Sequence, residues 1–150
     1  MKIIAQPVDL VTQQPAGVAV TLGDDSAGDY IAGGAPQFRP AKTQLDDLAY
    51  GAEIARAARG NAKTEVHWVT SREHESIAAA FEFEWDHGAA VPAYCHLQFT
   101  EGGASRYLAF AVLTAVNETE PRTQSTKFSY AATGGIATGD APAGMTDPAS

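Results

Sequence analysis

Cysteine is almost absent from this chain of 150 residues, since Cys95 is the only one. An intramolecular disulfide needs two cysteines and a four-cysteine zinc site needs four, so both are excluded. No apolar run approaches the roughly 18 residues of a membrane-spanning helix, and polar residues interrupt the N-terminal stretch too early for a signal peptide. The sequence therefore predicts synthesis in the cytoplasm, no membrane partner and a buried, structural Cys95.

Positive charge is also scarce. The chain has 10 Lys and Arg against 18 Asp and Glu, which gives a formal net charge of −8. This charge repels phosphate backbones and disfavours tight nucleic-acid binding. The length and the hydrophobic fraction of 45% predict a globular chain with one core. We expect a single β-rich domain over residues 1–135 and a flexible tail over 136–150, where Lys and Arg are missing.

The segment 13–46 is rich in Gly, Pro, Ala, Ser and Asp, which favour turns and resist a packed core. Two short apolar alternations, 18–22 and 30–32, interrupt it as possible brief strands. A connection of this length inside a compact domain is unusual unless it has a function, such as lying across a neighbouring subunit. We predict an extended arm, and the alternative is a surface segment without an interface role.

The β signal is strongest after Pro92. Strands are predicted over 93–100, 105–116 and 124–132, with a turn at 101–104 between the first two, and a further strand over 64–70. The three strands after Pro92 form a meander, and the folded part ends at the glycines after Thr133. Neither face of the strand 107–116 is consistently polar, so both faces are expected to be covered.

One helix is predicted over residues 71–87. Ser71 is a suitable N-cap and the dipeptide of His87 and Gly88 a suitable end. Ile77, Phe81 and Trp85 recur at helical spacing and predict a buried stripe. The alternation of Phe and Glu from 81 to 85 also fits a strand. Residues 49–59 have helical propensity but precede a turn signal at 59–61, so helix and hairpin both remain open there.

Candidate catalytic residues are few. No two of the four histidines have the three- or four-residue spacing that places two ligands on one helix face. His67 and His96 could meet across adjacent strands, which leaves a metal-binding or metal-dependent domain as an alternative. A carboxylate pair of Glu82 and Glu84 would need a strand and a cleft. We therefore predict no catalytic, cofactor-binding or metal-binding residues, and no enzyme.

Several short sequence motifs along the chain form a recognisable pattern. They are Arg59-Gly60-Asn61, the strand 64–70, Ser71-Arg72-Glu73-His74, Ala79-Ala80-Phe81, Asp86-His87, Val91-Pro92 and Tyr130-Ala131-Ala132-Thr133-Gly134-Gly135. Over residues 50–135 this pattern resembles structural proteins of bacteriophage tails. In such proteins the Arg-Gly-Asn turn is similar to a hairpin tip, which implies a hairpin over residues 52–70. The segment 13–46 departs from the pattern.

The resemblance implies a fold and a function. The chain is similar to tail-tube proteins, which implies an antiparallel β-sandwich or partial barrel with one packed helix. Such proteins form rings that stack into a channel. The implied function is a virion structural protein whose partners are identical subunits in a ring and other tail proteins. DNA would only pass through the channel, whose acidic lining would repel the DNA backbone. The implied location is the virion.

Six residues are the expected core or interface positions. They are Trp68, Phe81, Trp85, Leu108, Phe110 and Val112. The apolar strand 107–116 predicts self-association, because a short chain has few strands with which to cover both faces. Besides the phage tail subunit and the metal-binding or metal-dependent domain, a monomeric adaptor domain that binds one protein partner is an alternative.

Overall fold

The computed structural model describes residues 1–32, 36–41, 63–118 and 124–135, with residues 139, 141, 142 and 145. The alternatives for residues 49–59, the hairpin tip at 59–61 and most of the predicted tail lie outside the described residues.

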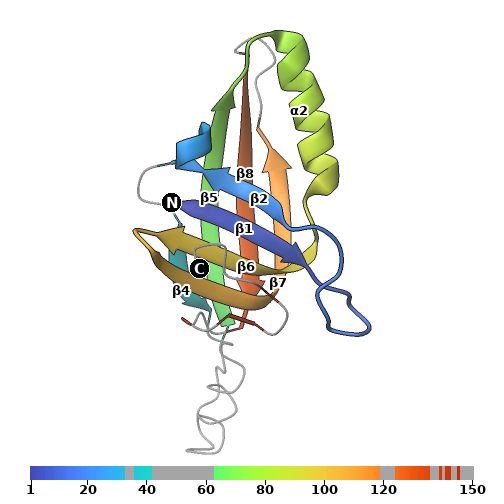
Figure 1. Cartoon of the computed structure of the whole chain (residues 1–150), viewed down its shortest axis with the longest axis vertical. Helices are drawn as coiled ribbons and strands as arrows, with labels where there is room; N and C mark the ends of the chain where they lie inside the picture. Colours follow the sequence, from blue (N-terminus) through green and yellow to red (C-terminus); the bar gives the residue numbers. More distant parts are fainter. Residues whose placement is uncertain are drawn as a thin grey trace, which may run out of the picture.

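Eight strands form one antiparallel sheet (Figure 1). They are β1 (Lys2–Pro7), β2 (Val20–Asp24), β3 (Asp29–Ile31), β4 (Gln37–Ala41), β5 (Lys63–Glu73), β6 (Tyr94–Glu101), β7 (Ala104–Asn117) and β8 (Ser125–Gly134). The strand order is β3-β2-β1-β6-β7-β8-β5-β4, and β3 also pairs with β5. This second pairing closes seven strands into a barrel.

The predicted meander is confirmed as β6, β7 and β8. Gly102 and Gly103 form the turn between β6 and β7, both with positive φ, which glycine adopts without steric cost. The β-rich fold with a helix is confirmed as well. The barrel is filled by buried apolar side chains from almost every strand, including Ile3, Leu22, Trp68, Leu97, Phe99, Leu108, Phe128 and Tyr130.

The prediction of an extended arm over residues 13–46 is wrong where the structure describes this segment. Three strands of the sheet, β2, β3 and β4, lie within it. Leu22 is fully buried, and its carbonyl accepts a hydrogen bond of 3.0 Å from the Trp68 indole N–H. The possible brief strands at 18–22 and 30–32 overlap β2 and β3, and β1 and β5 provide the backbone hydrogen-bond partners that hold these short strands in the sheet.

A short 3-10 helix, Asp25–Ala27, follows β2, and the α-helix α2 (Ile77–Ala90) begins later than predicted. Ser76 is its N-cap, with Oγ accepting from Ala79 N at 3.1 Å. Residues 71–73 belong to β5, because β8 pairs with that strand as far as Glu73. Gly88 lies inside the helix, which ends before Pro92. Pro has no N–H and restricts the residue before it to extended conformations.

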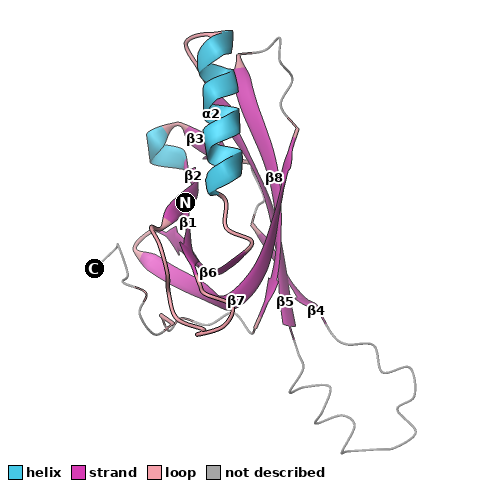
Figure 2. Ribbon diagram, turned by 90° about the vertical axis from the view of Figure 1, so that its right-hand side faces the viewer, coloured by secondary structure: helices cyan, strands magenta, loops and turns pink. Residues whose placement is uncertain are grey.

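The predicted buried stripe of α2 is also wrong. Ile77, Phe81 and Trp85 are exposed, while Ala80 is buried and Phe83 packs against the core. Figure 2 shows α2 standing at one end of the barrel beside β8. Apolar side chains surround most of this helix, so its sequence does not single out the face that is buried.

Candidate assembly surface

The outer face of β7 carries exposed apolar side chains. Ala111 and Leu113 are buried in the barrel, and the residues between and after them point the other way. Val112 is 58% exposed and Val116 is 57% exposed. Thr114 lies between these two valines and is exposed too, with its hydroxyl donating to the Ala131 carbonyl at 3.3 Å. We call Val112, Thr114 and Val116 the β7 outer row.

Phe110 extends this apolar surface at a bulge in the strand. The pairing register of β6 and β7 shifts between Cys95 and Leu97, and Phe110 has a φ of 51°. Its N–H donates to His96 Nδ1 at 3.0 Å, and its ring lies 4.7 Å from the His96 ring. Bulges of this kind redirect a side chain. Here the result is a phenyl ring that is 44% exposed, next to the outer row.

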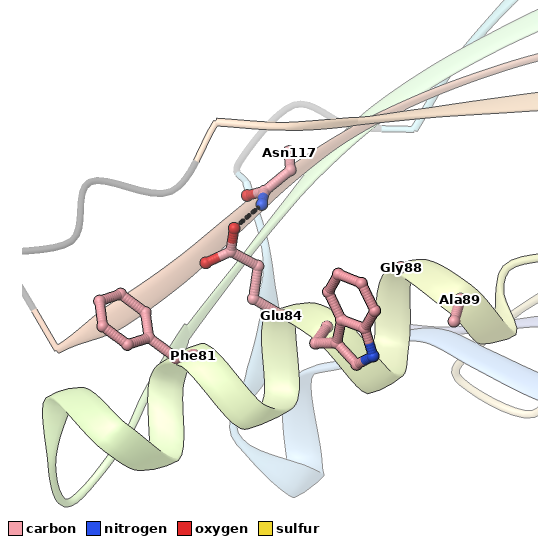
Figure 3. A pocket seen from close by; sticks show the side chains of 6 residues that line it. Phe81, Glu84, Gly88, Ala89 and Asn117 are labelled. Atoms are coloured by element: carbon pink, nitrogen blue, oxygen red, sulfur yellow. Dashed lines mark hydrogen bonds between the residues drawn. The ribbon is translucent and has the colours of Figure 1, made fainter.

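A second exposed surface is a groove between α2 and β7. It has a volume of about 540 Å³ and is lined by Phe81, Glu84, Trp85, Gly88, Ala89 and Asn117. Figure 3 shows the Glu84 side chain reaching from the helix to Asn117, whose amide donates a hydrogen bond to the Glu84 carboxylate. Gly88 and Ala89 are too small to fill the space beside the rings. The α2–β7 groove therefore combines two aromatic rings, a small-residue floor and one positioned carboxylate.

The opposite face of α2 attaches the helix to the barrel through aromatic rings and histidines. Phe83 stacks on His87 with ring centroids 5.0 Å apart, and His87 Nε2 lies 2.5 Å from the Tyr130 hydroxyl. The Arg72 guanidinium is 4.8 Å from the Phe83 ring centroid. Burial lowers the pKa of His87, and the charge of Arg72 lowers it further. His87 is thus neutral at pH 7, which suits a position between aromatic rings.

Asp29 is the buried carboxyl group of the same end of the barrel. It is 6% exposed and pairs in the sheet with Arg72 on one side and Asp24 on the other. Burial raises its pKa to about 6 even though the nearby Arg72 charge acts to lower it. The Asp29 charge also contributes to a raised pKa of Tyr130, whose main cause is burial. At neutral pH the ionised Asp29 carboxylate is therefore an unfavourable buried charge at the end of the barrel near α2.

Known proteins offer no guide to these surfaces. Comparisons with protein families, with curated proteins and with solved structures found no match to this chain. Among the helices that the structure describes, none is long and apolar enough to cross a membrane.

The six predicted core or interface residues fall into two groups. Trp68 and Leu108 are buried in the barrel core. The other four are exposed. Phe81 and Trp85 line the α2–β7 groove, Val112 belongs to the β7 outer row, and Phe110 lies beside that row. For these four, only the interface role remains, and it stays a prediction. The sequence singles out Glu84 only in a carboxylate pair with Glu82 and does not predict its contact with Asn117, because nothing in the spacing shows that two residues 33 positions apart converge.

The structure separates the two histidines of the metal alternative. His67 is exposed on β5, and His96 is buried on β6 with Nδ1 accepting from a backbone N–H. Strands β7 and β8 lie between β5 and β6. Among the described residues, no three His, Cys, Asp or Glu side chains are grouped closely enough to hold a metal ion. The Cys95 thiol is buried, which raises its pKa to about 12, so it is protonated at neutral pH.

Proposed function

We propose that this chain is a virion structural protein that self-assembles as a subunit of a phage tail, in the tube or in a ring associated with it. The observation that carries the proposal is the β7 outer row. Val112 and Val116 are exposed beside Phe110, although the interior of the barrel is already filled by other side chains. A second copy that covers this row would remove apolar surface from water, which favours association.

The free edge of β4 supports the same proposal. Among the described strands, β4 pairs only with β5. An edge strand presents unpaired backbone groups that can pair with another chain. Identical copies joined through such a surface close into a ring when the rotation between neighbours closes.

An acidic subunit suits a channel for DNA. The net charge of −8 would repel the phosphate backbone, so DNA would pass without specific binding. The proposed partners are identical subunits and other tail proteins of the virion, and the proposed site of synthesis is the host cytoplasm.

Sedimentation velocity over a wide concentration range tests the proposal. We expect species larger than the 15.7 kDa monomer, and we expect Val112→Lys to weaken association by about tenfold or more because a charge would be placed in the buried centre of the contact. Val18→Lys is the matched control, since Val18 is 84% exposed on the loop between β1 and β2. Immuno-electron microscopy of the phage particle locates the subunit. A strictly monomeric protein that is absent from the particle would refute the proposal and favour a monomeric adaptor.

A further inference from the structure

The α2–β7 groove has the chemistry to bind an arginine side chain. Aromatic rings attract cations, and Trp is the strongest of them in this role. The planar guanidinium group also matches a carboxylate in two parallel hydrogen bonds. In the groove, Trp85 and Phe81 supply the rings and Glu84 supplies the carboxylate. The floor at Gly88 and Ala89 leaves room for the aliphatic stem of the arginine.

The charge around the groove also favours a cationic side chain there. The stretch from Glu73 to Ser105 contains no Lys or Arg, and it includes all of α2. Glu82 and Asp86 are exposed on this helix in addition to the groove carboxylate of Glu84. The end of the molecule that carries α2 is therefore acidic, and it favours a cationic occupant.

The opposite end of the same chain exposes arginines. Figures 1 and 2 place β4 at the end of the barrel away from α2. Arg39 on β4 is exposed, and its guanidinium donates only to the neutral Gln37 side chain, at 3.2 Å, among the described residues. Arg106 is exposed as well, with its guanidinium 4.2 Å from the centroid of the Phe38 ring. The ion pairs of the described chain involve Met1, Lys2 and Lys127, and neither arginine.

We propose that the α2–β7 groove of one copy receives Arg39 from β4 of a second copy, so that copies associate head to tail. Arg39 is exposed on the edge strand β4, opposite Glu65 of β5 and without an ion pair to it within the described chain, so it can reach a neighbouring molecule without disturbing the barrel. The acidic α2 of one copy then faces the exposed arginines of the next. A head-to-tail contact is heterologous, so it generates rings when the rotation closes and stacks when it does not. This inference rests on the proposed function, because it assigns one of the surfaces used in self-assembly.

Charge reversal tests the pairing in the full-length chain. Glu84→Arg and Arg39→Glu should each weaken self-association by about tenfold or more, measured by sedimentation velocity. The double variant, in which the two charges are exchanged, should return to within about threefold of the unchanged protein, since residues in contact are energetically coupled. Glu82→Arg and Arg106→Glu are the matched controls. They make the same charge changes on the same helix and at the same end of the barrel, and should alter association by less than about threefold.

The two tryptophans give a second measurement. Trp85 is exposed at the groove, whereas Trp68 is buried and donates to the Leu22 carbonyl. The indole N–H signal of Trp85 in nitrogen-15 NMR spectra should shift as the protein concentration rises, and that of Trp68 should not. An unchanged Trp68 signal in each variant shows that the barrel is intact.

The outcomes separate this inference from the proposed function. A protein that stays monomeric at every concentration and is absent from the phage particle overturns both. A protein that assembles while Glu84→Arg and Arg39→Glu assemble equally well overturns only the role of the groove. Weakening in both single variants without recovery in the double variant overturns the pairing of Glu84 with Arg39.

Discussion

Replacing Asp29 by Asn should stabilise the protein at neutral pH and leave its stability nearly unchanged in acid. The pKa of Asp29 is raised from 3.8 to about 6 by burial. Each pKa unit corresponds to about 1.4 kcal/mol, so ionised Asp29 lowers the free energy of unfolding by about 3 kcal/mol. Asn has a similar shape and no charge, which removes this cost.

The pH dependence follows from proton binding. Between pH 3.8 and about 6 the folded state binds the Asp29 proton more tightly than the unfolded state does. Stability contributed by this group is present below pH 3.8 and is lost as the pH rises through 6. The difference in unfolding free energy between Asp29→Asn and the unchanged protein should therefore grow from pH 4 to pH 7 and stay level above pH 7.

Urea unfolding followed by tryptophan fluorescence at several pH values between 4 and 8 measures this difference. Any effect of the amide itself is independent of pH, so the shape of the curve isolates the carboxylate. Asp9→Asn is the control, because hydrogen bonds from the Thr12 and Val11 N–H groups lower the pKa of the exposed Asp9, so its difference from the unchanged protein should stay nearly level between pH 4 and 8 and change only in stronger acid. A difference that is flat from pH 4 to 8, or that shrinks as the pH rises, would show that Asp29 does not carry a buried charge.

Three further predictions concern the core and α2. Leu108→Ala should lower the free energy of unfolding by about 2–5 kcal/mol, because Leu108 is fully buried. The exposed Trp85 gives the contrast, since Trp85→Ala should change this free energy by less than about 0.5 kcal/mol in the monomer. Equal losses of the two variants in denaturant unfolding would contradict the assignment. Gly134→Ala should cost about 1–3 kcal/mol, since its Cβ would lie 2.8 Å from Leu108 Cγ and 3.0 Å from the Ala109 carbonyl; an unchanged melting temperature would refute the close contact. Because the pKa of His87 is lowered in the folded state, its stabilising contribution is lost as the pH falls below 6.5. His87→Phe should therefore lose less stability than the unchanged protein between pH 7 and 5. Identical profiles of unfolding free energy against pH would contradict this.

The sequence alone determined the elements with strong local signals. The strands of the meander, 93–100, 105–116 and 124–132, agree with β6, β7 and β8 to within a few residues, because their apolar and β-branched residues are bounded by turn residues. A helix before Pro92 was also predictable, although its caps and its buried side were not. Trp68 in β5 and Leu108 in β7, two of the predicted core or interface residues, are both buried.

Tertiary structure decided where the helix begins and which side of it is buried. Ser71 and Ser76 are both suitable N-caps, but only Ser76 is used, because β8 holds residues 71–73 of β5 in the sheet. The α2 stripe of Ile77, Phe81 and Trp85 is as apolar as the opposite side. The buried side is fixed by Phe83 and His87 meeting rings of β8 and Arg72 of β5.

Tertiary structure also decided the barrel and the groove. The strand signals at 18–22 and 30–32 are short, and β2 and β3 are held in the barrel because distant strands supply their hydrogen-bond partners. Closure depends on β3 meeting β5 about 40 residues later in the chain. Glu84 and Asn117 also meet through tertiary structure, since α2 follows β5 in the chain and only β8 separates β5 from β7 in the sheet. Such contacts join residues far apart in sequence, and local sequence patterns carry no information about them.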